Sequence, residues 1–116
     1  MKTYSGHCHC EAVRYEVDTD LTRVIECNCS HCAMKGLILT FVPAAQFRLL
    51  SGEDNLAVYR FNRGKIDHLF CRTCGVESFG RGRNSKGDDT VSINIRCLDD
   101  VDPATISVTP FDGKNL

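Results

Sequence analysis

The chain has 116 residues, enough for one domain with a single modest core, and we expect one domain over residues 1–116. Hydrophobic residues make up 42% of it and charged residues 25%, which is ordinary for a globular protein. The net charge of -1 argues against nucleic acid as a partner, and the apolar runs are too short to cross a membrane.

Strand patterns dominate the chain. Val13, Tyr15 and Val17 alternate with polar residues, which is the period of a half-buried strand. The segment 37–42 is apolar and ends at Pro43, as a buried strand does. The sequence also predicts strands at 47–50, 57–61, 66–70 and 90–96, a hairpin turn at 62–65 and a loop at 80–89.

Helical signals are few. Ser30 is a possible cap for a short turn over residues 31–35 that ends at Gly36, and residues 43–46 can form a single turn. The tail 99–116 is expected to be a peripheral turn and strand with a loose terminus. These patterns predict a mainly β domain with zinc knuckles at strand ends.

Seven of the eight cysteines fall into three tight clusters, which hold two, three and two. Residues 1–4 lead straight into polar sequence without the apolar segment of a signal peptide, so we expect a cytoplasmic protein with reduced thiols. Metal binding is then favoured over the alternative, a small disulfide-rich domain. The clusters are Cys8 with Cys10, the cysteine triplet Cys27, Cys29 and Cys32, and Cys71 with Cys74.

The counts predict two zinc ions per chain. A structural zinc takes four protein ligands, whereas a reactive zinc usually has three and an open position. The first and third clusters together supply four thiolates, and one ion shared by them would tie distant parts of the chain together. Cys71-x-x-Cys74-Gly75 has the form of a zinc knuckle, in which the glycine permits a left-handed turn that aims backbone N–H groups at sulfur.

The cysteine triplet can wrap one ion within six residues. The spacing of the triplet does not decide whether the fourth coordination position of its ion stays open, because a residue distant in sequence can fill it. The candidates for a fourth ligand are Cys97, His7, His9, His31 and His68. His31 is also a candidate proton relay beside the open position, and His68 a candidate donor to a ligand near Cys71.

With these clusters placed, the chain resembles the glutathione-dependent formaldehyde-activating enzyme family, whose domain also occurs in the centromere protein V group. The resemblance covers roughly residues 3–102. It is carried by Gly6-x-Cys8-x-Cys10, Cys27-x-Cys29-Ser30-x-Cys32, Gly36, His68-x-Phe70-Cys71-x-x-Cys74-Gly75 and Asn94-x-Arg96-Cys97-Leu98.

The resemblance implies a β-tent fold, a structural zinc on Cys8, Cys10, Cys71 and Cys74, and a catalytic zinc on the cysteine triplet. It also implies glutathione as co-substrate and formaldehyde as the aldehyde, which would make the protein a carbon–sulfur lyase of the S-(hydroxymethyl)glutathione synthase type. Glu11 departs from the family, which usually has glycine there, so we expect the local turn to differ.

Three thiolates leave a zinc ion with one net negative charge, which favours binding a thiol over activating water. The partners expected are therefore a small thiol and an aldehyde. A pocket for the glutathione carboxylates needs cations, for which Arg60, Arg63, Arg72, Arg81, Arg83 and Arg96 are the candidates. The alternative is a zinc-stabilised β-tent binding or chaperone-type module without catalysis.

Overall fold

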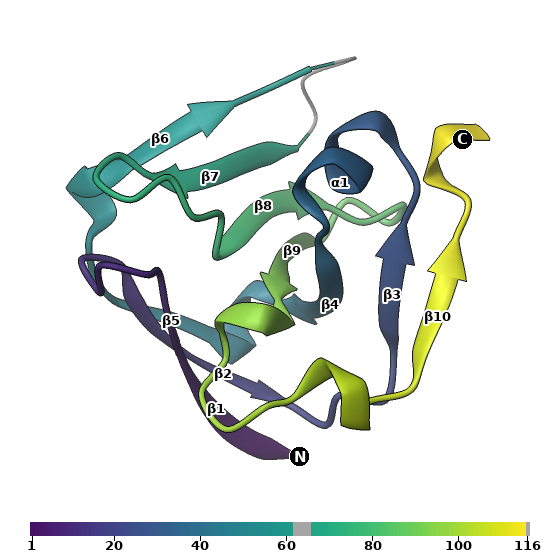
Figure 1. Cartoon of the computed structure of the whole chain (residues 1–116), viewed down its shortest axis with the longest axis horizontal. Coiled ribbons are helices and arrows are strands. Elements are labelled where there is room, and N and C mark those ends of the chain that lie inside the picture. Colours follow the sequence, from purple (N-terminus) through teal and green to yellow (C-terminus); the bar gives the residue numbers. More distant parts are fainter. Residues whose placement is uncertain (62–65, 116) are drawn as a thin grey trace.

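The computed structural model describes residues 1–61 and 66–115, and these form a mainly β domain (Figure 1). Its one α-helix within these residues is α1 (Ser30–Lys35). The strands are β1 (Lys2–His7), β2 (Arg14–Thr19), β3 (Val24–Cys27), β4 (Ile38–Pro43), β5 (Phe47–Ser51), β6 (Leu56–Tyr59), β7 (Asp67–Cys71), β8 (Phe79–Arg83), β9 (Asp89–Asn94) and β10 (Val108–Phe111). Short 3₁₀ turns occupy Ala44–Gln46, Glu53–Asn55, Ile95–Cys97, Pro103–Thr105 and Gly113–Asn115.

Two open sheets build the domain. A 3-stranded sheet has the order β1-β2-β5, and a 7-stranded sheet has the order β10-β3-β4-β9-β8-β7-β6. Neighbouring strands are antiparallel except β10, which runs parallel to β3 along the edge of the larger sheet (Figure 1). The expected mainly β, β-tent class with a single compact domain is confirmed. In the described residues, α1 is far too short to reach across a bilayer.

The core lies between the two sheets. Tyr15 of β2 packs against Phe47 of β5 and Phe79 of β8, with ring centroids 5.2 and 5.7 Å away. The predicted alternation on β2 is confirmed, because Val13, Tyr15 and Val17 are fully buried. Gly6 is required on β1, since a Cβ there would lie 2.4 Å from the Tyr15 ring. Aromatic contact across the sheets therefore fixes how they lean together.

The prediction of a loop at 80–89 is wrong. Residues 79–83 form β8, which pairs with both β7 and β9, and only the short connection 84–88 is a turn. Gly80 lets the strands approach, since a Cβ there would lie 2.8 Å from Ser92 Oγ and 3.0 Å from the Asp67 carbonyl. Gly80, one of the glycines that suggested a loop, thus serves close packing in a central strand.

The other local expectations are largely confirmed, except that the strand expected at 90–96 ends at Asn94 and Ile95–Cys97 form a 3₁₀ turn. The short helix begins at Ser30, although its capping side chain is that of Cys29, and it ends at Gly36 with a left-handed φ of 64°. The turn at 43–46 and the strand in the tail are present. The sequence does not predict β1 and β3, because neither strand shows a clear alternation of apolar and polar residues. The hairpin turn at 62–65 lies outside the described residues.

Candidate metal centres and the residues around them

The first and third cysteine clusters come together in the structure. Their four sulfur atoms all lie within 4.8 Å of one another, and we call this group the four-cysteine cluster (Cys8, Cys10, Cys71 and Cys74). The Cys10 sulfur is 3.7 Å from that of Cys8 and 3.6 Å from that of Cys71. Tetrahedral zinc with bonds of roughly 2.3 Å spaces its sulfurs about 3.8 Å apart, so the spacing fits such an ion.

Backbone N–H groups surround these sulfurs. The N–H of Val13 donates to Cys8 Sγ and that of Thr73 to Cys71 Sγ, each at 3.4 Å. Gly75 takes the left-handed φ of 79° expected of a knuckle. Burial raises the pKa of Cys74, but backbone and neighbouring thiol hydrogen bonds outweigh burial and lower that pKa to about 6. Cys74 therefore favours the thiolate, the form that binds metal.

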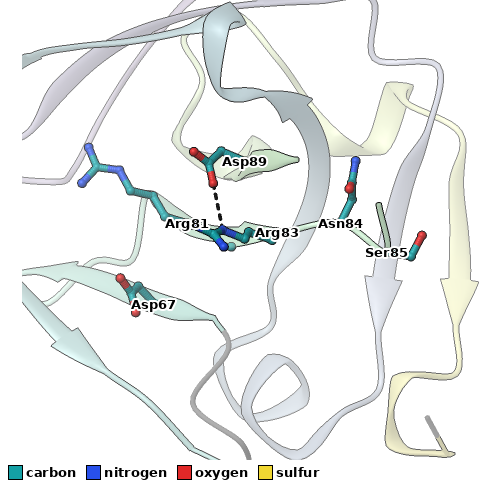
Figure 2. A pocket seen from close by; sticks show the side chains of 7 residues that line it. Asp67, Arg81, Arg83, Asn84, Ser85 and Asp89 are labelled. Atoms are coloured by element: carbon teal, nitrogen blue, oxygen red, sulfur yellow. Dashed lines mark hydrogen bonds and ion pairs between the residues drawn. The ribbon is translucent and has the colours of Figure 1, made fainter. Parts of the chain in front are cut away.

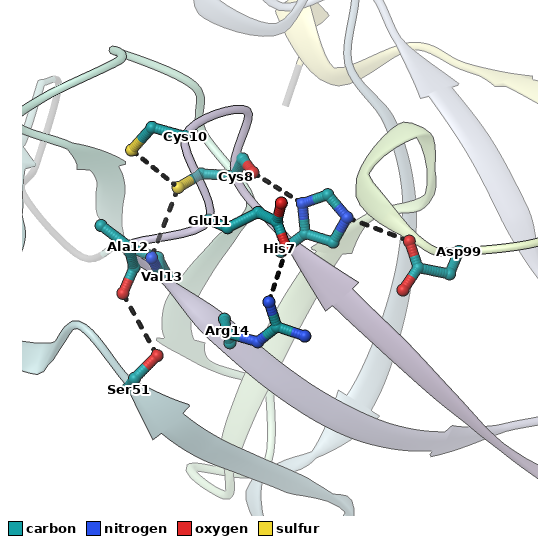
Figure 3. A network of polar contacts seen from close by, with 9 residues as sticks. All are labelled: His7, Cys8, Cys10, Glu11, Ala12, Val13, Arg14, Ser51 and Asp99. Atoms are coloured by element: carbon teal, nitrogen blue, oxygen red, sulfur yellow. Dashed lines mark hydrogen bonds and ion pairs between the residues drawn. The ribbon is translucent and has the colours of Figure 1, made fainter.

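The loop that carries Cys8 and Cys10 is held by polar contacts on both sides (Figure 3). Glu11 takes a φ of 67°, the left-handed region that a glycine would occupy, and its carboxylate accepts from Arg14 at 2.6 Å. Glu11 thus takes a backbone conformation that glycine adopts more readily, and the difference of this turn from that of the family stays a prediction. His7 Nδ1 donates to the Cys8 carbonyl and Nε2 lies 3.0 Å from Asp99; these contacts raise the pKa of His7.

The cysteine triplet forms a second group at the end of β3 and the start of α1. The three sulfurs lie within 4.8 Å of one another. The N–H of Cys29 donates to Cys27 Sγ and the N–H of Cys32 to Cys29 Sγ, both at 3.4 Å. Burial raises the pKa of Cys29, yet these local hydrogen bonds outweigh it and the pKa is lowered. Three sulfurs this close together, two of which accept backbone N–H bonds, can hold one metal ion.

A turn after β10 covers one side of the triplet. The Asn28 side chain donates to Asp112 and accepts from the N–H of Lys114, at 2.9 and 3.0 Å. A Cβ on Gly113 would lie 2.4 Å from Cys27 Sγ, so this turn reaches the sulfur only because the residue is glycine. Figure 1 shows the two segments side by side, at the tops of β3 and β10.

None of the candidates for a fourth ligand joins the triplet group in the described part of the chain. Cys97 instead lines a cavity of 400 Å³ together with His7, Cys8 and His9. All eight cysteines are free thiols, which contradicts the disulfide alternative.

The remaining two histidines meet a residue that the sequence did not single out. His31, His68 and Glu77 offer ligand atoms within 4.8 Å of one another, and we call them the histidine–glutamate group. Burial raises the pKa of Glu77, but the His68 and Lys35 side chains beside its carboxylate outweigh burial and the pKa is lowered. The sequence does not predict that Glu77 meets His31, because no spacing rule links the two residues. Their proximity follows from the position of β7 and from the path of the chain after Cys74.

The candidate arginines that the structure describes do not gather at the triplet. Arg60 pairs with Asp67 at 2.6 Å, and Arg72 donates to the Leu56 carbonyl at 3.1 Å. Arg81 and Arg83 line a cavity of 740 Å³ whose walls also carry Asp67, Asn84, Ser85 and Asp89 (Figure 2). Arg83 pairs with Asp89 there at 3.2 Å. Arg96 lines the Cys97 cavity, and Arg63 lies outside the described residues. The large cavity contains no cysteine, so its size alone does not make it the reactive site.

Two open β-sheets with clustered free cysteines define a mainly β, cysteine-rich domain with the means to bind metal. Residues 3–111 match the profile of the glutathione-dependent formaldehyde-activating enzyme family, and the chain belongs to this family. A crystal structure of a Rhodobacter sphaeroides protein is also similar, with a TM-score of 0.82 and 29% identity over 92% of this chain and 99% of that one. The family implies an enzyme-like function that involves glutathione and formaldehyde.

Proposed function

We propose that the protein is a zinc-dependent carbon–sulfur lyase that acts on adducts of a thiol and an aldehyde. The observation that carries the proposal is the cysteine triplet, a set of three sulfurs without a fourth Cys, His, Asp or Glu in its group among residues 1–61 and 66–115. Three protein ligands are the pattern of a zinc that keeps a position for substrate. The four-cysteine cluster, by contrast, has the complete set of a structural zinc.

The donor chemistry of the triplet fits zinc. Sulfur ligands that receive backbone N–H bonds are stabilised as thiolates, and the two such bonds here come from Cys29 and Cys32 within the same turn. A zinc ion held by the triplet would supply an open coordination position at which an incoming thiol loses its proton near neutral pH. The protein residues therefore position the ion and donate backbone hydrogen bonds to two of its three sulfur ligands.

The reaction proposed joins glutathione and formaldehyde. The sulfur of the thiol forms a bond to the carbonyl carbon, the C=O π bond breaks, and the thiol proton ends on the carbonyl oxygen, which gives S-(hydroxymethyl)glutathione. The reverse reaction cleaves the same carbon–sulfur bond. Orientation of the two reactants is the main gain that a protein can offer such a step. Cytoplasm is the proposed compartment, since thiols stay reduced there.

The alternative function is a binding or chaperone-type module in which both ions are structural. That alternative needs a closed second site. In the described residues Cys97 lies in a different cavity from the triplet, and His31 belongs to a different group. The geometry therefore favours the enzyme.

X-ray absorption at the zinc edge, with and without glutathione, tests the proposal. The protein alone should show an average of the four-sulfur site and a site with three sulfurs and one lighter atom. Adding the thiol should convert the second site to four sulfurs. Four sulfurs at both sites before any thiol is added would remove the basis for the enzyme.

A matched pair of cysteine variants separates catalysis from folding. Cys29→Ser should keep the fold and abolish thiol-dependent turnover, because it removes a triplet sulfur on a local turn. Cys97→Ser should keep both the fold and the turnover, since Cys97 is outside the triplet group. Thiol-dependent consumption of formaldehyde and zinc content per chain measure the two effects. Activity in Cys29→Ser with the triplet zinc lost would contradict the assignment.

A further inference from the structure

The histidine–glutamate group is separate from the triplet sulfurs, although both include a residue of α1. His31 and Cys32 are neighbours in this helix, so their side chains point in directions about 100° apart. His68 comes from β7 and Glu77 from the segment between β7 and β8. Three elements thus bring two imidazoles and a carboxylate to one place that the proposed reaction does not use.

The group is buried, and one of its members lacks hydrogen bonds. The His31 and Glu77 side chains are 9% and 5% exposed, and that of His68 is 11% exposed. Neither ring nitrogen of His31 has a hydrogen-bond partner among the described residues, although both nitrogens are shielded from solvent. Buried polar atoms without partners cost free energy, and such an atom calls for an explanation such as a bound ion.

The separations within the group suit a metal ion. His31 Nε2 is 3.4 Å from Glu77 Oε1, and His68 Nδ1 is 3.6 Å from Glu77 Oε2. These distances are long for hydrogen bonds. Ligands at the usual nitrogen and oxygen bond lengths of roughly 2.0–2.2 Å stand about 3–3.5 Å apart around one ion. The same atoms therefore make poor hydrogen bonds and a good ligand set.

We propose that His31, His68 and Glu77 bind a divalent first-row transition-metal ion, separately from the two cysteine groups. Two imidazoles and one carboxylate form a donor set of intermediate softness, which suits ions such as Zn²⁺, Fe²⁺ or Co²⁺ and leaves coordination positions free. The site faces a cavity of 530 Å³ that His31 lines together with Tyr59, Phe61 and Phe70. A small ligand entering that cavity can reach the free positions.

Lys35 takes the place of the ion in this structure. Its Nζ lies 2.9 Å from Glu77 Oε1, the same oxygen that faces His31. The Lys35 side chain is 35% exposed and lines the cavity mouth, so it can swing into solvent when an ion binds. Ammonium and metal ion compete for one carboxylate, which predicts that removal of Lys35 tightens metal binding.

Titration with Co²⁺ of protein that carries two zinc ions per chain, one in each cysteine group, tests the proposal. With both cysteine groups already filled, one further ion per chain should bind, without the strong thiolate-to-cobalt absorption of sulfur ligation. Paramagnetic shifts should appear on the imidazole signals of His31 and His68 and not on those of His7. Glu77→Gln and His68→Ala should each weaken binding more than about 100-fold, since even outer partners of metal ligands are worth 10–100-fold.

Lys35→Met is the discriminating variant. Under the proposal it strengthens Co²⁺ binding by about tenfold or more, because it frees the carboxylate. If the group is only a structural ion pair, Lys35→Met leaves Glu77 unpaired and binds no ion. The proposal is overturned if the zinc-loaded wild type takes up no further cobalt, or if the His31 and His68 signals stay unshifted when it does. The imidazole signals of His31 and His68 in the wild type test the proposed site even if His68→Ala does not fold.

Discussion

The two cysteine groups differ in what they connect. In the four-cysteine cluster, Cys10 and Cys71 are 61 residues apart in sequence and join the smaller sheet to β7 of the larger one. In the triplet, the ligands lie within six residues at one end of β3. Burial varies within each group: Cys8 and Cys71 are almost completely buried while Cys10 is exposed, and Cys32 is buried while Cys27 and Cys29 are partly exposed.

This contrast separates fold stability from reactivity. A cross-link between distant segments restricts the unfolded chain strongly, so the free energy of binding an ion there becomes free energy of folding. An ion held by one short turn adds little to the long-range order, and a partly exposed position remains accessible to substrate. The same ligand type can therefore serve two roles, which the topology of the chain assigns.

The largest expected effect follows from opening the four-cysteine cluster. Cys71→Ser removes a buried sulfur that accepts from Thr73 and Asn55. Structural zinc in small domains contributes about 10–16 kcal/mol of apparent binding free energy, which exceeds or equals the whole stability of most domains. We expect Cys71→Ser to be insoluble or largely unfolded by circular dichroism and thermal melting. A cooperative melt close to that of the wild type would defeat the pairing of the first and third clusters.

A smaller effect is expected from pushing the covering turn away from the triplet. Gly113→Ala places a methyl group 2.4 Å from Cys27 Sγ, so the turn or the sulfur must move. Overpacking of this kind costs about 1–3 kcal/mol, and less where a surface segment can shift. We expect faster loss of one zinc ion to a chelator, with the second ion and the fold retained. The release of zinc over time, followed with a colorimetric dye, measures this.

The control for Gly113→Ala is Lys114→Ala, which shortens a side chain in the same turn while the hydrogen bond from its backbone N–H to Asn28 remains. That variant should release zinc at the wild-type rate. Equal acceleration in both variants would mean that the turn is merely mobile and that the contact with Cys27 has no role. Parallel loss of both ions in Gly113→Ala would show that the two groups are not independent.

The sequence predicts the two cysteine groups well because their ligands come in short, fixed spacings. A CxxC or CxCxxC motif brings its own sulfurs together whatever the rest of the chain does. The histidine–glutamate group escapes such reasoning, since Glu77 meets His31 only after α1 packs beside β7. β8 was missed for a related reason: Gly80 signals a loop locally, but the close approach of Ser92 and Asp67 makes it a strand residue. Long-range contacts decide both cases.

The smallest expected effect concerns the end of the small sheet that is remote from the four-cysteine cluster. Asp18 of β2 binds the Arg48 guanidinium of β5 at 3.0 Å and accepts from Thr3 at 2.7 Å. The hydrogen bonds from Arg48 and then from Thr3 lower the pKa of Asp18 to about 2. Since the folded-state pKa lies below the unfolded one, this stabilisation is complete above the unfolded pKa and is lost as the pH falls through the folded value.

Asp18→Asn should therefore lower the urea midpoint slightly and by a constant amount from neutral pH to about pH 5, with the difference from the wild type shrinking below about pH 4. The effect stays small because exposed ion pairs are screened by water. Glu16→Gln, which alters a carboxylate 3.6 Å from the same arginine, should lower the urea midpoint less.

If β1 and β2 are held chiefly through the four-cysteine cluster, the small sheet survives Asp18→Asn and is lost in Cys71→Ser. A loss in Asp18→Asn as large as in Cys71→Ser would mean that ion pairs, and not the metal, hold the two sheets together.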